Sequence, residues 1–126
     1  MNPKDYIEKA LRTESCDYAK ISERMQNKCT IRLLHAGIGL ATESGEFLDA
    51  LKKHIYYGKE LDKVNLIEEI SDQMWYCAIA LDELGVSFEE VMAKNIAKLS
   101  ARYPEKFTEE KAENRDLEIE RSILEK

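Results

Sequence analysis

Apolar residues along the chain recur at intervals of three and four positions, which is the spacing of an amphipathic helix. No segment shows the strict alternation of apolar and polar residues that is typical of a β-strand. The chain has only five glycines and two prolines to interrupt helices. The pattern therefore predicts an all-α protein, an antiparallel bundle of about four to five helices.

Capping residues predict where these helices begin and end. Asn2 followed by Pro3 is typical of a helix start, and Pro104 disfavours helix at the residue before it. Ser87 and Glu90 have the spacing of a capping box. The expected helices run from Pro3 to about Asn27, from about Thr30 to before Gly58, from after Asp62 to Gly85, from after Ser87 to near Arg102, and from after Thr108 to Leu124.

The length of 126 residues and the hydrophobic content of 44% fit one domain, 1–126, with no room for a second. We expect its core to span about residues 30–104. Residues 108–126 form a charged C-terminal helix or tail with a thin apolar stripe, which we expect to pack on a partner or to fray.

The formal net charge of −6 argues against polymeric nucleic acid or an anionic membrane as a partner. No apolar run has the length of a signal peptide or a membrane span. The three cysteines, Cys16, Cys29 and Cys77, match neither a metal knuckle nor a disulfide framework. A reducing cytoplasm is the expected setting.

Two pairs of acids lie within the most apolar parts of two consecutive helices. Glu43 and Glu46 form the first pair, and Glu69 and Asp72 form the second, each with a spacing of three residues. This spacing places both acids of a pair on one helix face. Single pairs of this kind are more often solvated, but two pairs on consecutive apolar helices favour a shared site.

Four carboxylates that converge between helices repel one another and are costly to desolvate unless a cation compensates. Mg²⁺ prefers oxygen ligands and keeps waters and substrate phosphates in its coordination shell. The acids therefore predict a Mg²⁺ site, with Mn²⁺ as an alternative.

The sequence around these acids resembles that of the MazG-like all-α nucleotide pyrophosphohydrolases. The resemblance rests on Glu-x-x-Glu at 43–46 and, after 22 residues, Glu-x-x-Asp at 69–72. It extends to the flanking residues 40–42 and 68, to Tyr76, and to Arg102-Tyr103-Pro104. It covers roughly residues 31–107, which is most of the chain.

The resemblance implies that Glu43, Glu46, Glu69 and Asp72 hold Mg²⁺. It also implies that a water held by metal and carboxylate attacks a nucleoside triphosphate between the α and β phosphates, releasing a monophosphate and pyrophosphate. Glu43 and Glu46 are the two candidates for the base. Phosphoribosyl-ATP pyrophosphohydrolases and dimeric dUTP hydrolases are related alternatives.

Basic residues offer further contacts for the substrate. Lys94, Lys98 and Arg102 recur every four residues and are named here the basic stripe, with Asn95 beside them. They either hold the triphosphate and sugar or form an ordinary solvated face. Lys53, seven residues after Glu46, is either a phosphate ligand or a partner of the helix C-terminus.

Aromatic residues near the acids have two interpretations. Tyr76 follows Asp72 by one helical turn and either lines the nucleotide pocket or packs in the core with Trp75. His35, eight residues before Glu43, is interpreted as a core histidine rather than a ligand.

Two other classes of protein compete with the enzyme. A carboxylate-bridged iron protein requires Glu-x-x-His pairs, and neither His35 nor His54 has an acid three residues before it. A non-catalytic helical interaction module with solvated acids stays open. We expect the chain to form a homodimer or homotetramer. The resemblance implies oligomers, and the long apolar helices need more burial than one copy supplies.

Overall fold

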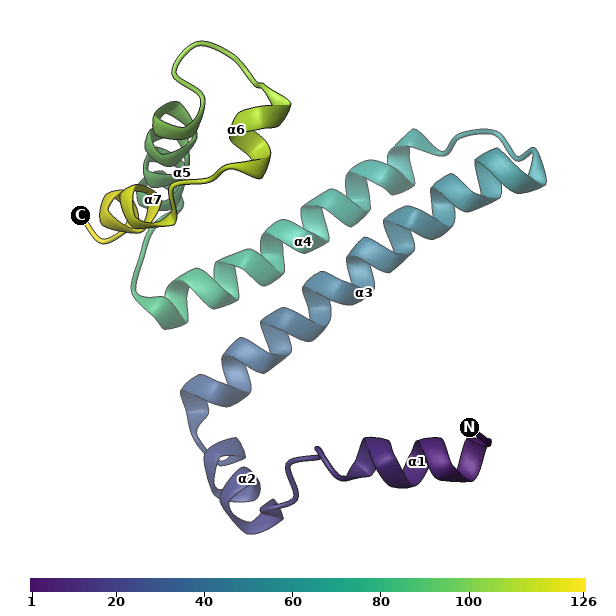
Figure 1. Ribbon diagram of the computed structural model, residues 1–126. Coiled ribbons are helices and arrows are strands. Elements are labelled where there is room, and N and C mark those ends of the chain that lie inside the picture. The colour runs from purple at the N-terminus through teal and green to yellow at the C-terminus, as the bar shows by residue number, and fades with distance from the viewer.

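The structure, a computed structural model of residues 1–126, contains seven helices and no strand, which confirms the all-α prediction. None of its helices is both long and apolar enough to cross a lipid bilayer. In chain order the helices are α1 (Pro3–Leu11), α2 (Tyr18–Met25), α3 (Lys28–Tyr57), α4 (Lys63–Leu84), α5 (Phe88–Arg102), α6 (Glu109–Glu113) and α7 (Leu117–Leu124) (Figure 1).

The two longest helices, α3 and α4, form an antiparallel hairpin that dominates the molecule (Figure 1). Asn27 begins α3 by accepting a hydrogen bond of 3.2 Å from the backbone N–H of Thr30. Gly58 ends the helix in the left-handed conformation, with φ of 66°, which glycine adopts without a steric penalty. Asp62 then caps α4 through the N–H of Asn65, so the turn between the helices is fixed at both ends.

The C-terminal helices form a second unit in which α7 packs on α5. Ser87 caps α5 by accepting a hydrogen bond of 3.1 Å from the N–H of Glu90, as the capping box predicts. The helix ends at Arg102, two residues before Pro104, which is also as predicted. The hairpin and the C-terminal unit are joined at Gly85, whose φ of 69° turns the chain out of α4.

The predicted number of helices was wrong because two expected helices are each divided. The first breaks between α1 and α2, where the Thr13 hydroxyl donates to the carbonyl of Ala10 and Asp17 caps α2 through the N–H of Lys20. The last breaks between α6 and α7, where Asp116 caps α7 through the N–H of Ile119. In both places a short polar side chain bonds to the local backbone, an alternative to continuing the helix.

A single chain encloses almost no core. The buried residues are Ala36, Gly39, Glu69 and Glu120. Ala36 is the only one of them with an apolar side chain. The outer faces of the α3–α4 hairpin expose Leu34, Ile38, Leu48, Ile67 and Met74, among others. The bundle predicted from the sequence is therefore not closed within one copy.

Candidate metal centre

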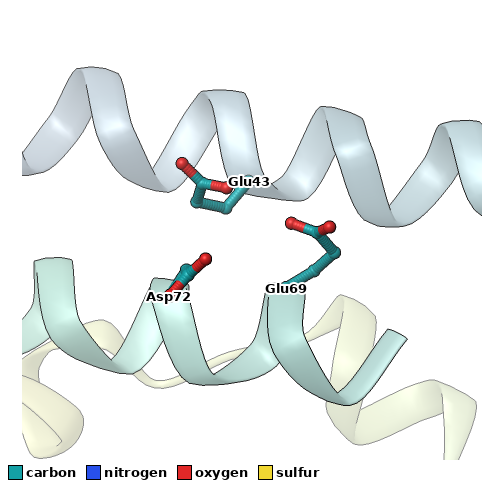
Figure 2. Close-up of side chains that lie close together, drawn as sticks. All are labelled: Glu43, Glu69 and Asp72. Carbon is teal, nitrogen blue, oxygen red and sulfur yellow. The ribbon is translucent and has the colours of Figure 1, made fainter. Parts of the chain in front are cut away.

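Three of the four predicted acids meet between α3 and α4. One carboxylate oxygen from each of Glu43, Glu69 and Asp72 lies within 4.8 Å of the other two. Figure 2 shows the side chain of Glu43 on α3 close to those of Glu69 and Asp72 on α4. The antiparallel packing of the helices thus brings together acids that are 26 or more residues apart in the sequence.

Glu69 is the acid most removed from solvent, with 3% of its surface exposed. The side-chain amide of Asn65 donates to Oε1 of Glu69 at 2.6 Å, from one helical turn earlier. No lysine or arginine forms an ion pair with Glu43, Glu69 or Asp72. A buried carboxylate beside two others is costly to maintain without a compensating positive charge.

Neutral polar side chains surround the acids, and sequence reasoning missed them. The Thr42 hydroxyl lies 3.3 Å from Oε1 of Glu43, although the carbonyl of Gly39 competes for its proton at 2.9 Å. Ser44 on α3 and Gln73 on α4 are 3.4 Å apart, which links the two helices beside the acids. Asn65 had a detectable signal, because its spacing of four residues from Glu69 places both on one helix face.

Glu46 does not belong to the group of three acids. It lies on α3 one turn after Glu43, it is exposed, and no ion pair or hydrogen bond engages its side chain. The structure therefore brings together Glu43, Glu69 and Asp72 and leaves the fourth acid at the edge of the cluster.

The donor set fits a hard divalent cation. All three converging ligands are carboxylate oxygens, and neither a histidine nor a cysteine belongs to the group. Such a set suits Mg²⁺ or Mn²⁺ rather than zinc, which favours nitrogen and sulfur ligands. The three cysteines are free.

Tyr76 packs between the helices rather than standing free in a pocket. It is half-buried, its ring lies against Gly39, and its centroid is 5.6 Å from that of His35 and 4.9 Å from that of Trp75. His35 is exposed in the single chain, packs against these two rings, and does not belong to the group of acids. Tyr76 lies one helical turn after Asp72, so this aromatic group packs next to the acid cluster along the hairpin.

The predicted phosphate ligands do not reach the acids within one chain. Lys53 Nζ pairs with Asp49 Oδ2 on its own helix at 2.7 Å. Lys94 Nζ pairs with Glu90 at 2.8 Å, and Arg102 binds Glu120 on α7. Lys94, Asn95 and Lys98 line a groove beside α7 on the C-terminal unit instead of facing α3 and α4.

Comparison with known proteins adds one finding. A family model described as the MazG nucleotide pyrophosphohydrolase domain matches residues 34–107, a range that includes all four acids. No curated protein and no solved structure matches the chain. Because the match spans more than half of the 126 residues, the chain belongs to the MazG nucleotide pyrophosphohydrolase family.

Proposed function

We propose that the protein is a Mg²⁺-dependent nucleoside triphosphate pyrophosphohydrolase. It cleaves an NTP or dNTP between the α and β phosphates and releases a nucleoside monophosphate and pyrophosphate. Membership of the family supports nucleotide pyrophosphohydrolysis in general. The metal is our inference from the acid cluster, whereas the triphosphate substrate and the position of cleavage are what the sequence resemblance implies.

The observation that carries this proposal is the environment of Glu69. Its carboxylate is buried, lies within 4.8 Å of two others, and has only the neutral Asn65 amide as a side-chain partner. A solvated acidic face, as in a non-catalytic interaction module, gives no reason to bury one of its carboxylates. A metal centre does, because exclusion of water strengthens the attraction between the carboxylates and the ion.

The residues of the cluster have separable roles in this proposal. Glu43, Glu69 and Asp72 would hold Mg²⁺, which neutralises charge on the phosphoryl oxygens and lowers the pKa of an attacking water. Asn65 orients the Glu69 carboxylate through its hydrogen bond. Glu46 lies outside the group of three and is exposed, so it stays available to accept a proton from that water.

We also propose that the functional unit is a homo-oligomer. A compact protein of 14.6 kDa exposes about 6,900 Å² of surface. This chain exposes 10405 Å². The excess of roughly 3,500 Å² is larger than the share of one partner in a standard interface and is typical of obligate assemblies.

The exposed apolar residues of the hairpin indicate what covers them. On α3 they are Ile31, Leu34, Ile38, Leu48 and Ile55, which are 3, 4, 10 and 7 residues apart and fall on the a and d positions of a heptad, the positions that face a packed helix. On α4 a second stripe comprises Val64, Ile67 and Met74. A hairpin of two helices with such stripes corresponds to one half of a four-helix bundle. A second hairpin, from another copy, would cover these apolar residues and complete the bundle.

A panel of nucleotides tests the reaction. Purified protein is incubated with Mg²⁺ and each canonical NTP and dNTP, dUTP and phosphoribosyl-ATP, and the products are separated by ion-exchange chromatography. Monophosphate with pyrophosphate is the expected outcome for at least one of them. Diphosphate with orthophosphate, or no metal-dependent product from any nucleotide, contradicts the proposal and favours the interaction module.

A further inference from the structure

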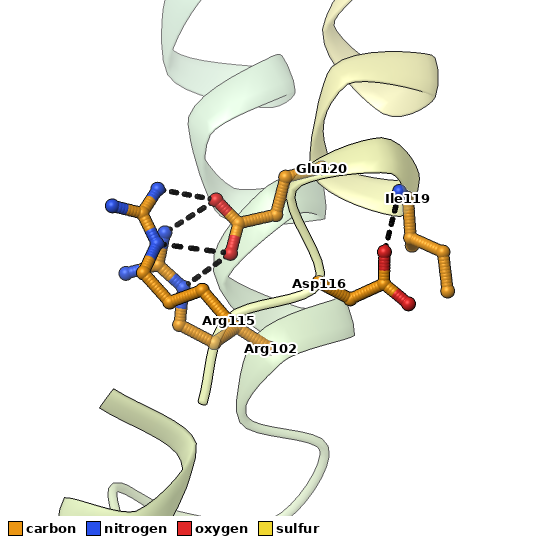
Figure 3. Close-up of polar contacts among 5 residues, drawn as sticks. All are labelled: Arg102, Arg115, Asp116, Ile119 and Glu120. Atoms are coloured by element: carbon orange, nitrogen blue, oxygen red, sulfur yellow. Dashed lines mark hydrogen bonds and ion pairs between the residues drawn. The ribbon is translucent and has the colours of Figure 1, made fainter. Parts of the chain in front are cut away.

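A carboxylate on α7 binds two arginines, Arg102 at the end of α5 and Arg115 in the connection between α6 and α7. Glu120 is 5% exposed and accepts hydrogen bonds from Arg102 at 2.7 and 2.5 Å and from Arg115 at 3.4 and 2.6 Å. Figure 3 shows the Glu120 carboxylate facing both guanidinium groups. Glu120 and Arg115 lie outside residues 34–107, the part of the chain that the family model matches.

This contact is the most buried polar attachment of α7, and Ile123 is the only large apolar side chain of the helix that is partly buried. The large apolar side chains of α7 are mostly open to solvent, with Leu117 at 63%, Ile119 at 52% and Leu124 at 41% exposure. The one buried residue of the helix is Glu120. An attachment that depends on a carboxylate between two guanidinium groups is open to competition from other anions, which apolar packing would resist.

The same helix runs beside the basic stripe. Lys94, Asn95, Lys98 and the α7 residue Leu124 line one groove, and Arg102 and Glu120 line a second, smaller cavity with Ala101, Asp116 and Ile119. Arg102 is thereby removed from solvent, with 15% of its side chain exposed, while Arg115 keeps 44%. In this state the Nε and Nη2 edge of Arg102 cannot bind another ligand.

We propose that Arg102 and Arg115 form a polyphosphate-binding site that Glu120 occupies in the resting chain. A guanidinium binds carboxylates and phosphates with the same paired N–H donors, so the carboxylate of Glu120 marks a geometry that phosphate oxygens also satisfy. Glu120 and Asp116, which also lines this cavity, together balance the charge of the two arginines, so release of Glu120 leaves a net positive charge for an incoming anion. A polyphosphate brings more charge and more acceptor oxygens than one carboxylate, so it displaces Glu120 and releases α7.

A free polyphosphate and the triphosphate tail of a nucleotide both offer phosphate oxygens that can accept hydrogen bonds from the two arginines. Inorganic tripolyphosphate and a nucleoside triphosphate, compared at equal charge, separate the two sources. Binding of tripolyphosphate alone is independent of catalysis, whereas the kinetic consequence described below rests on the proposed function.

Hydrogen exchange of the full chain tests the displacement. Saturating inorganic tripolyphosphate, with the metal chelated, should raise the exchange rates of the α7 amides, while sodium chloride at matched ionic strength should not. Release of α7 by ATP but not by tripolyphosphate assigns the site to the nucleotide tail, and release by both assigns it to the phosphate chain. Unchanged α7 protection with both ligands overturns the proposal.

Calorimetric titration of variants tests the role of Glu120. Glu120→Gln should bind tripolyphosphate at least about fivefold more tightly than wild type, since apparent affinity scales with the fraction of chains in which the site is open. Glu118→Gln, an exposed residue of the same helix, changes net charge equally and should bind as wild type does. Equal affinities for the two variants would falsify the proposal, and the exchange experiment on wild type decides it if Glu120→Gln does not fold.

Arg102 does not reach the acids of its own chain, so the kinetic consequence also rests on the proposed oligomer, in which another copy supplies the acids. In that assembly Glu120→Gln should lower the KM for the nucleotide by a similar factor and leave kcat within twofold. A raised KM would instead show that Glu120 positions Arg102 for the substrate, and it would contradict the displacement. Absence of turnover in the wild type, with the α7 response to tripolyphosphate intact, refutes the proposed function and leaves this site standing.

Discussion

The ring of Tyr76 lies directly against Gly39, so that a Cβ added to the glycine would fall 2.1 Å from Cε1 of the tyrosine. Gly39 is four residues before Glu43 on α3, and Tyr76 is four residues after Asp72 on α4. Because the helices are antiparallel, this contact lies one turn from the acids on both. The missing side chain at residue 39 therefore lets the helices approach where the carboxylates must meet.

The first prediction is that Gly39→Ala destabilises the fold. The added methyl group forces the Tyr76 ring away from α3, which should lower the free energy of unfolding by about 1–3 kcal/mol. Urea denaturation measures the change. Gly37→Ala is the matched control, because nothing lies within 4 Å of a Cβ there and alanine favours helix by up to about 1 kcal/mol. Equal stability of the two variants would show that the contact is not tight.

The second prediction concerns Glu69. Glu69→Gln should reduce kcat at least about 100-fold, a loss typical of removing a group that stabilises transition-state charge. The apo protein should be as stable as wild type or more so, because one of three clustered like charges is gone. Mg²⁺ should raise the melting temperature of wild type and raise that of the variant much less.

The exposed neighbour Glu68 provides the control for this experiment. Glu68→Gln makes the same chemical change one residue away and should keep both turnover and the thermal response to Mg²⁺. Full activity in Glu69→Gln, or equal loss in both variants, would remove the acid cluster as the metal centre.

A third prediction follows from the hydrogen bond between Asn65 and Glu69. Asn65→Ala removes the donor that fixes the buried carboxylate, so Mg²⁺ affinity should fall about 10-fold, as is typical for residues that orient a metal ligand. Titration of the Mg²⁺-induced change in melting temperature measures the affinity. Ser71→Ala is a suitable control, since the Ser71 hydroxyl bonds only to the carbonyl of Ile67 on its own helix.

The sequence predicted best those features that depend on local spacing. The caps at Asn2, Asp62, Ser87 and Thr108 all form, because each signal is read from a few adjacent residues. The breaks at Asp17 and Asp116 were missed, although both residues cap the next helix in the same way. Each stands in a polar stretch without a glycine or proline, so the periodicity there gave no sign of an interruption.

The candidate site could be predicted in part for the same reason. Spacing of three residues places Glu69 and Asp72 on one face, but the register between α3 and α4 decides that Glu43 joins them and Glu46 does not. Arg102 was expected to hold phosphate, and its partner Glu120 lies 18 residues away on a helix of weak apolar character. Such long-range pairings have no periodic signature in the sequence.

The fourth prediction tests the oligomer. Leu48→Glu places a charge in the exposed apolar stripe of α3, where Leu48 is 63% exposed in a single chain. Each copy would lose about 2 kcal/mol of apolar burial in the interface, so the dissociation constant should rise at least about 100-fold. Sedimentation equilibrium measures it. Lys59→Glu, in the exposed turn between α3 and α4, introduces the same residue and should leave assembly unchanged.

The fifth prediction is that acid releases α7. Hydrogen bonds from Arg102 and then Arg115 lower the pKa of Glu120 from 4.5 to about 2 in the folded chain. A group whose pKa is depressed by folding stabilises the folded state fully above its unfolded pKa and loses that contribution as pH falls through its folded pKa. The attachment should therefore be intact at neutral pH and weaken progressively from about pH 4.5 toward pH 2. Asp116 lines the same small cavity and caps α7, and it is present in both proteins compared below. Glu120→Gln has no carboxylate to protonate, so its α7 protection factors should be lower than those of wild type at pH 7 and should converge with them near pH 2. Amide exchange by NMR at pH 7, 5, 4 and 2.5 measures this difference, and a constant difference across the series would show that the charge of Glu120 does not hold the helix.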